Sequence, residues 1–364
     1  MTKPSSIEIL SWQAVAPGEP LQRTARRLEL ASLRPDEAVV EVAGCGVCHT
    51  DLGFLYDGTR PGKPFPLTLG HEISGRVVHA GASAASLVGT PVVVPAVIPC
   101  GECALCKQGR GSICRKQIFP GSDVDGGFAT HVVVPARGLC PVDEAALGRV
   151  GLGLADVSVL ADAISTAYQA VIRSGVRAGD LAAVVGVGGV GGFAAQIAAA
   201  LGAHVVALDV DDERLRLAGE HGAALTINSR GLDPGEIRKR MAAEGKQRGW
   251  PALCWKLFET SGRTAGQQLA FGLLGFGATM MVVGFTRDKV DVRLSNLMAF
   301  DATLQGNWGC LPEHYPAALQ LVLDGKVRLA PFIERRPLSS INDTFRELHE
   351  GKLKKRPVLV PDFA

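Results

Sequence analysis

The chain has 364 residues, a length that suggests two domains. Hydrophobic residues make up 47% of it and charged residues 20%, which supplies apolar surface for packed cores and excludes disorder as the main state. Lys and Arg (38) nearly balance Asp and Glu (36), and a net charge of +2 argues against nucleic acid or an anionic membrane as the main partner.

The first 150 residues contain short β-branched segments bounded by Gly and Pro. These segments are residues 37–44, 75–81, 90–97 and 129–136. The pattern predicts a compact, mostly antiparallel β domain. The N-terminal residues are polar and lack the apolar core of a secretion signal, so we expect a soluble, cytoplasmic protein.

From about residue 165 apolar strands alternate with helical stretches. The strands are 181–187, 204–210 and 278–285, and the helical stretches are 191–203 and 211–223. This alternation predicts a parallel sheet covered by helices. A break rich in Gly, Trp and Pro follows at 306–316, and the final strand at 356–361 is assigned back to the first domain. The predicted division is 1–163, 164–305 and 306–364.

A glycine-rich turn joins the strand at 181–187 to the following helix. Its cofactor-binding residues are predicted to be Gly186, Gly188, Gly189, Val190 and Gly191, with glycines at G-x-G-x-x-G spacing. Such glycines allow a tight turn and let a pyrophosphate approach the backbone at the start of a helix. The same pattern accounts for the charge-free stretch 181–203 better than a membrane span does.

Asp209 ends the next predicted strand, where an acid would accept hydrogen bonds from the adenosine ribose. Its charge would repel the 2′-phosphate of NADP, which favours NAD. Asp209 could instead cap the helix that follows.

Four of the nine cysteines crowd into one short lobe at about 98–116. They are Cys100, Cys103, Cys106 and Cys114. Four thiolates at this spacing match a closed, structural zinc site. An iron–sulfur cluster and a set of redox cysteines are the alternatives.

Several of these motifs together resemble the zinc-dependent medium-chain alcohol dehydrogenases. The resemblance runs from about residue 30 to the C-terminus. It rests on the motifs CGVCHTD, LGHE, GGFATHVVV and GVGGVG, on the four-cysteine lobe and on a basic GKLKKR segment. It implies a GroES-like, mostly-β catalytic domain and an inserted Rossmann domain with a doubly wound parallel sheet, an α/β fold that binds NAD and two zinc ions per subunit.

The resemblance implies that Cys48 and His71 are ligands of a catalytic zinc. The third ligand of the family is usually a cysteine, and here Asp162 stands in its place. One thiolate, one imidazole and one carboxylate would neutralise Zn²⁺ and leave a fourth position open. The alternative is that Asp162 caps a helix and the catalytic zinc is absent.

Other roles also follow from the resemblance. Thr50 would accept the alcohol proton, and Asp51 and Glu72 would orient the ligands from outside the ligand set. His49 and Arg356 would contact the cofactor pyrophosphate, with solvated surface charges as the alternative. Many relatives have a histidine where this chain has Gly53, so the onward proton route must use water or another group.

Residues 250–262 and 292–310 resemble the 6-hydroxycyclohex-1-ene-1-carbonyl-CoA dehydrogenases of anaerobic benzoyl-CoA breakdown. This implies a small-molecule acyl-CoA substrate with a ring secondary alcohol, oxidised to the 6-oxo compound. The alternatives are a broader secondary-alcohol or polyol dehydrogenase, and a non-catalytic NAD-binding protein that keeps only the structural zinc. By analogy we expect a homo-oligomer, a dimer or tetramer.

Overall fold

The computed structural model describes residues 5–363, and the chain divides into two compact units. The first unit comprises Met1–Asp162, Gly309–Leu319 and Phe332–Ala364, and the second comprises Ala163–Trp308 and Gln320–Pro331. The segment 320–331 lies with the second unit, whereas the sequence assigned it to the first. Gln196 explains this, because its Oε1 accepts a hydrogen bond from the Arg328 amide at 2.7 Å.

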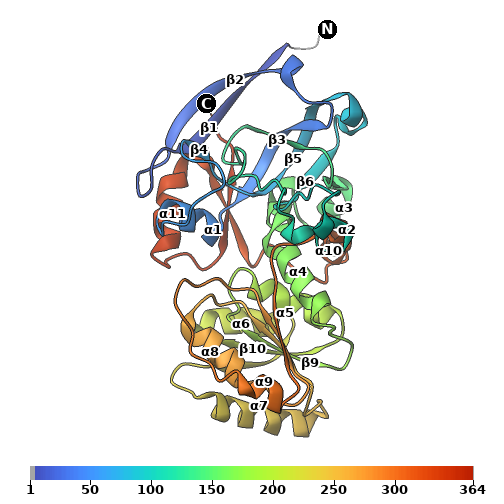
Figure 1. The fold of residues 1–364 in the computed structure, drawn as a ribbon, viewed down its shortest axis with the longest axis vertical. Helices are drawn as coiled ribbons and strands as arrows, with labels where there is room; N and C mark the ends of the chain where they lie inside the picture. Colours follow the sequence, from blue (N-terminus) through green and yellow to red (C-terminus); the bar gives the residue numbers. More distant parts are fainter. Residues whose placement is uncertain (1–4, 364) are drawn as a thin grey trace. The chain divides into compact units, whose positions relative to one another are not determined.

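The first unit contains a seven-stranded sheet (Figure 1). Its strands are β3 (Glu37–Gly46), β5 (Glu72–Ala80), β6 (Pro91–Val94), β7 (His131–Pro135), β8 (Cys140–Pro141), β15 (Ile333–Pro337) and β16 (Arg356–Val360). Their order is β15-β16-β3-β5-β6-β8, with β7 paired to β3. Every pair is antiparallel except β15 with β16. The four segments predicted as strands become β3, β5, β6 and β7, and 356–361 returns as β16.

A smaller sheet and short helices complete the first unit. The sheet has the order β2-β1-β4, from β1 (Ser6–Ala14), β2 (Gln22–Glu29) and β4 (Leu67–Thr68). The α-helices are α1 (His49–Leu55), α2 (Ala104–Lys107), α3 (Glu144–Arg149) and α11 (Ile341–His349), with α10 (Tyr315–Leu323) beginning in this unit. The 3₁₀-helices are η1 (Leu30–Ser32), η2 (Ala82–Leu87), η3 (Gly111–Ile113), η4 (Leu154–Ala161), η5 (Pro312–His314) and η6 (Leu338–Ser340). The core includes Phe128 and Phe345, whose rings meet edge to face at 5.6 Å.

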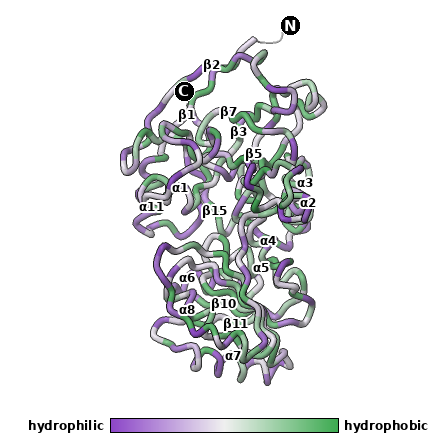
Figure 2. The backbone as a smooth tube through the Cα atoms, viewed as in Figure 1, coloured by the Kyte–Doolittle hydropathy of each residue, from purple (hydrophilic) through white to green (hydrophobic). Residues whose placement is uncertain are grey.

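The second unit is built on a six-stranded parallel sheet. The strands are β9 (Leu181–Val185), β10 (His204–Asp209), β11 (Ala223–Asn228), β12 (Lys256–Glu259), β13 (Thr279–Val282) and β14 (Thr303–Gly306). The helices are α4 (Ala163–Arg173), α5 (Gly191–Ala200), α6 (Asp212–Glu220), α7 (Pro234–Arg248), α8 (Thr264–Gly272) and α9 (Ser295–Ala299). All five residues of β9 are buried, as expected for a strand covered on both faces, and β10 lies among segments coloured hydrophobic in Figure 2.

The strands lie in the order β11-β10-β9-β12-β13-β14. From β9 the chain builds the sheet outward through β10 and β11, and it then returns to the other side of β9 to add β12, β13 and β14. In open parallel sheets, ligands bind beyond the carboxyl ends of the strands at such a reversal. The glycine-rich turn lies there, between β9 and α5. The charge-free stretch 181–203 is therefore a strand, a turn and a helix, and no helix within residues 5–363 is long and apolar enough to cross a bilayer.

Candidate metal centres and cofactor loop

Three segments that are distant in the sequence bring Cys48, His71 and Asp162 together within the first unit. Cys48 follows β3 and caps α1, His71 precedes β5, and Asp162 follows η4. The helix η4 packs on β3 and β5. It can approach closely because a Cβ at Gly44 would lie 2.8 Å from the carbonyl oxygen of Ala155.

The ligand atoms of these residues converge on one point. The Oδ2 atom of Asp162 lies 3.6 Å from Sγ of Cys48 and 3.5 Å from Nε2 of His71. One oxygen of Glu72 belongs to the same group, in which all ligand atoms lie within 4.8 Å of one another. Glu72 was predicted to stand outside the ligand set, and the structure brings it close enough to offer an oxygen itself.

The chemistry of this cluster fits a divalent cation. Neither ring nitrogen of His71 makes a hydrogen bond within the described part of the chain, although the side chain is 1% exposed. The carboxylates of Asp51 and Asp162 lie near these nitrogens without hydrogen-bond geometry, and a cation at Nε2 would give that nitrogen a direct partner. Burial lowers the pKa of His71, but the carboxylates of Asp51 and Asp162 outweigh it and raise the pKa well above its usual value. The surroundings therefore attract positive charge.

Asp51 holds two of the three ligand-bearing segments. Its carboxylate accepts hydrogen bonds from the Cys48 amide at 3.0 Å and the Gly70 amide at 3.1 Å. Its Oδ1 also lies 3.4 Å from Nδ1 of His71. This fully buried carboxylate ties the start of α1 to the Gly70–His71 segment that precedes β5.

Glu72 and Arg356 form a buried ion pair beside the cluster. Burial lowers the pKa of Arg356, but Glu72, Cys48 and Asp162 together outweigh burial and raise the pKa overall. The guanidinium is only 8% exposed, so Arg356 is not the solvated surface charge that the sequence left open. Arg356 is the first residue of β16, so its ion pair with Glu72 links this strand to the cluster.

The remaining residues of the CGVCHTD motif lie around Cys48. The Oγ1 atom of Thr50 is 3.7 Å from the sulfur of Cys48, and Thr50 is half-buried. His49 is exposed at the start of α1 and is outside the group of ligand atoms. Phe119, which the sequence did not single out, lies with its ring centroid 4.9 Å from that of His71.

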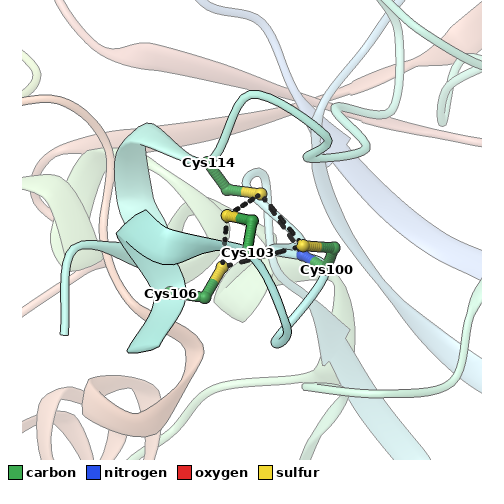
Figure 3. A group of neighbouring side chains, drawn as sticks. All are labelled: Cys100, Cys103, Cys106 and Cys114. Atoms are coloured by element: carbon green, nitrogen blue, oxygen red, sulfur yellow. Dashed lines mark hydrogen bonds between the residues drawn. The ribbon is translucent and has the colours of Figure 1, made fainter. Parts of the chain in front are cut away.

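The four cysteines of the lobe form a second cluster, with their sulfurs facing one another (Figure 3). The sulfur of Cys103 is 3.5 Å from that of Cys106 and 3.6 Å from that of Cys114. Cys100 completes the set, 3.5 Å from Cys114 and 3.9 Å from Cys106. Zn–S bonds of about 2.3 Å in a tetrahedron separate the sulfurs by about 3.8 Å, so these distances fit one zinc ion.

These distances argue against both alternatives for the lobe. A disulfide needs sulfurs about 2.05 Å apart, and all nine cysteines are free. An iron–sulfur cluster distributes its thiolates over several irons, which holds them farther apart than around a single ion. Backbone hydrogen bonds lower the pKa of Cys100 to about 6, whereas burial raises that of Cys106 to about 12.

The glycine-rich turn of the second unit has room only for glycine at its ends. A Cβ at Gly191 would lie 1.9 Å from the carbonyl oxygen of Gly186. Gly186 itself has a φ of 88° and is packed on Ser261. Gly188, Gly189 and Val190 are half-buried between them. The close packing at Gly186 and Gly191 is the reason that this turn requires glycine at both positions.

Asp209 ends β10 beside this turn. Its Oδ2 accepts a hydrogen bond from the Val187 amide at 2.9 Å, and its Oδ1 accepts from Val210 at 2.7 Å and Asp211 at 3.0 Å. The carboxylate thus ties the glycine-rich turn to the end of the strand. The cap of α6 is Asp211, which accepts from the Glu213 and Arg214 amides, so the capping role considered for Asp209 belongs to its neighbour.

The sequence did not single out two residues that lie beside the turn. Glu259, at the end of β12, is fully buried and accepts hydrogen bonds from the Ser261 and Gly262 amides at 2.8 and 3.2 Å. Arg214 places Nη1 3.7 Å from where a Cβ on Gly188 would be. Neither residue belongs to the glycine motif, and only the folding of the sheet brings them to it.

Comparisons with known proteins agree with both units. Residues 34–144 match the alcohol dehydrogenase GroES-like domain, and residues 189–324 match the zinc-binding dehydrogenase family. An alcohol dehydrogenase of Geobacillus stearothermophilus is 32% identical over 337 residues, which cover 92% of this chain and 94% of that protein.

The chain belongs to the zinc-dependent medium-chain alcohol dehydrogenase family. It is a zinc-dependent dehydrogenase of the alcohol or polyol type, with a nicotinamide dinucleotide as its second cofactor. The predicted GroES-like and Rossmann-like fold is confirmed.

Solved structures show the same fold along nearly the whole chain. The alcohol dehydrogenase of Aeropyrum pernix superposes with a TM-score of 0.84 at 28% identity, covering 97% of this chain and 100% of that one. The galactitol-1-phosphate dehydrogenase of Escherichia coli has a TM-score of 0.83 at 25% identity, with the same coverage of 97% and 100%. These dehydrogenases differ in the substrates that their names state, so the fold leaves the substrate of this chain open.

Proposed function

We propose that this dehydrogenase uses NAD to oxidise a cyclic secondary alcohol at a zinc ion held by Cys48, His71 and Asp162. The observation that carries the proposal is the convergence of one thiolate, one imidazole and one carboxylate within 4.8 Å. A catalytic zinc typically has three protein ligands and one open position. The side chain of Asp162 is 19% exposed, whereas that of His71 is 1% exposed, so a small molecule would reach the cluster from the Asp162 side.

The zinc ion supplies Lewis acidity, which favours loss of a proton from an alcohol near neutral pH. Cys48 and Asp162 contribute two negative charges that balance the dication. Asp51 keeps the Cys48 and His71 segments in place, and Arg356 compensates the charge of Glu72. Cys48 and Asp162 would therefore neutralise the bound zinc, and Arg356 neutralises Glu72.

Thr50 is proposed to receive the alcohol proton, because its hydroxyl lies beside the ligand sulfur. Bound NAD⁺ would supply the hydride acceptor, so oxidation of the alcohol would yield a ketone, NADH and H⁺. No side chain at Gly53 can carry the proton onward. Water or another group must complete this route.

The glycine-rich turn is proposed to hold the pyrophosphate of NAD, with the adenosine ribose on Asp209. The negative charge of Asp209 favours NAD over NADP. Contacts of His49 and Arg356 with the pyrophosphate stay predictions, and any such contact of Arg356 is made while it is paired with Glu72.

We propose 6-hydroxycyclohex-1-ene-1-carbonyl-CoA, an intermediate of anaerobic benzoyl-CoA breakdown, as the substrate, oxidised to its 6-oxo product. The support is the resemblance of residues 250–262 and 292–310. These residues belong to the second unit, except Gly309 and Cys310, which belong to the first. The experiment compares kcat/KM for this thioester with that for cyclohexanol. A preference for the thioester supports the proposal, and equal values favour a broader secondary-alcohol or polyol dehydrogenase.

Metal content and turnover test the function itself. The wild-type protein should contain two zinc ions per subunit and reduce NAD. Cys48→Ala should lose one zinc and turnover while NAD still binds, whereas Cys140→Ala, which removes a buried thiol outside both clusters, should keep all three properties. A single, thiolate-bound zinc in the wild type would indicate a non-catalytic NAD-binding protein instead.

We also propose that the dehydrogenase is a cytoplasmic homo-oligomer. Nine free cysteines, including four clustered thiols, suit a reducing compartment. Exposed apolar side chains at Leu294, Met298 and Leu304, on and near the edge strand β14, suit contact with a second copy. Light scattering on the purified protein tests this, and a monomeric mass would contradict it.

A further inference from the structure

We propose that the hydroxyl of Tyr315 positions the metal ligand Asp162. The inference rests on the proposed function, because it assumes that Asp162 binds the catalytic zinc. Tyr315 lies far along the chain from Asp162, at the start of α10, in the short stretch Gly309–Leu319 that returns to the first unit. It is a positioning residue, since it acts on the backbone next to the ligand.

The hydroxyl of Tyr315 joins two backbone segments. It donates a hydrogen bond to the carbonyl oxygen of Ala161, the residue immediately before Asp162. It accepts one from the amide of Ala96 at 3.2 Å, just beyond β6. The Ala96 amide also reaches the Ala161 carbonyl at 3.3 Å, which closes a three-membered cluster.

This cluster is shielded from water. Tyr315 and Ala161 are 0% exposed and Ala96 is 2% exposed. Hydrogen bonds in such low-dielectric surroundings are stronger than in water, and no solvent molecule can replace a lost partner easily. The Tyr315 hydroxyl therefore constrains the peptide group that precedes Asp162.

Asp162 depends on this constraint more than the other ligands do. It stands between η4 and α4 with φ −136° and ψ −63°, outside helical geometry, so the direction of its side chain follows from the end of η4. Cys48 and His71 have Asp51 as their common support. At Asp162 the corresponding support acts on the backbone, through the Tyr315 hydroxyl.

The experiment measures zinc release from the holoenzyme to a chromophoric chelator, for the wild type and for Tyr315→Phe. Phe keeps the ring and removes only the hydroxyl. Loss of a group that supports a metal ligand typically weakens metal binding about 10- to 100-fold, so one of the two release phases should become roughly tenfold faster. The phase of the four-cysteine site should not change. With Co²⁺ at the catalytic site, the absorption bands of the variant should also shift.

Ser74→Ala is the matched control. Ser74 is 0% exposed, and its hydroxyl donates to the carbonyl oxygen of Leu154 at 2.7 Å, at the opposite end of η4 from Asp162. Ser74→Ala, like Tyr315→Phe, removes a hydroxyl that donates to a backbone carbonyl of η4. Both variants should therefore lower the thermal midpoint, but only Tyr315→Phe should selectively change zinc release.

Two results would overturn the inference. Release kinetics and Co²⁺ spectrum equal to wild type in Tyr315→Phe would show that the hydroxyl does not position the ligand. An equal acceleration in Ser74→Ala would reduce its role to general stability. A wild-type protein with only one zinc would instead refute the proposed function, and the inference with it, so the two failures can be told apart.

Discussion

Asp209 offers the sharpest test of how the cofactor loop works. We predict that Asp209→Asn shifts the preference of the dehydrogenase from NAD towards NADP. The carboxylate accepts hydrogen bonds from three backbone amides, Val187, Val210 and Asp211, and is 6% exposed. The side chain of Asn has only one oxygen, which can accept either from Val187 or from Val210 and Asp211, but not from both sets.

The size of the effect follows from these contacts. If the Asn oxygen keeps the two bonds to Val210 and Asp211, its NH₂ group faces the Val187 amide, and one buried N–H loses its partner. Such a loss costs about 1–3 kcal/mol of folding stability. Replacing a charged acceptor of the ribose hydroxyls by a neutral one removes about 1–2 kcal/mol more from NAD binding, or roughly tenfold in Kd. NADP should bind more tightly, because the negative charge facing its 2′-phosphate is gone.

The assay measures KM and kcat for NAD and NADP, together with the thermal midpoint. Asp211→Asn is the control, since Asn caps a helix as well as Asp does and Asp211 caps α6. The ratio of kcat/KM for NAD to that for NADP should fall at least about tenfold in Asp209→Asn and stay constant in Asp211→Asn. An unchanged ratio in Asp209→Asn would refute the assignment of the ribose to Asp209.

Three further predictions concern the lobe, the aromatic ring beside His71 and the cofactor loop. Cys103→Ser should reduce zinc from two ions to one per subunit and lower the thermal midpoint on the order of 10 °C, because the lobe loses its cross-link. Phe119→Ala should lower kcat/KM for the cyclic alcohol roughly tenfold, with KM for NAD unchanged, since its ring borders His71. Glu259→Ala should raise KM for NAD more than it lowers kcat, because the Ser261 amide loses its acceptor.

Each of these has a comparison that isolates its cause. Cys254→Ser changes an exposed thiol outside both clusters and should keep both zinc ions. Phe119→Leu keeps an apolar wall and should recover most of the activity. Glu259→Gln keeps an acceptor for the Ser261 amide and should have a smaller effect on KM for NAD. Two zinc ions per subunit in Cys103→Ser would contradict the structural zinc site. The same KM for NAD in Glu259→Ala as in Glu259→Gln would contradict the role of Glu259 as the acceptor for the Ser261 amide.

The parts of the fold that are encoded locally could be predicted from the sequence. The Cys100–Cys114 spacing predicts a four-sulfur site because a short loop can close around one ion by itself. The residues around the turn from Gly186 to Gly191 directly predict a strand, a turn and a helix. Both depend on contacts between near neighbours in the chain. By contrast β11, β12 and β14 were not singled out, because their positions in the sheet depend on pairing with strands elsewhere in the sequence.

Residue types alone therefore specified the four-cysteine lobe, the dinucleotide motif and the alternation of strands and helices, whereas the ligand set of Cys48, His71 and Asp162 followed from the family resemblance. Tertiary structure decided which distant groups meet. It brought Asp162 to Cys48 and His71, joined Arg356 to Glu72, and set the Tyr315 hydroxyl against the peptide before Asp162. The physical reason is that these contacts arise only when β16 joins the sheet, η4 packs on that sheet and the start of α10 reaches the end of η4, and no local pattern in the chain encodes that packing.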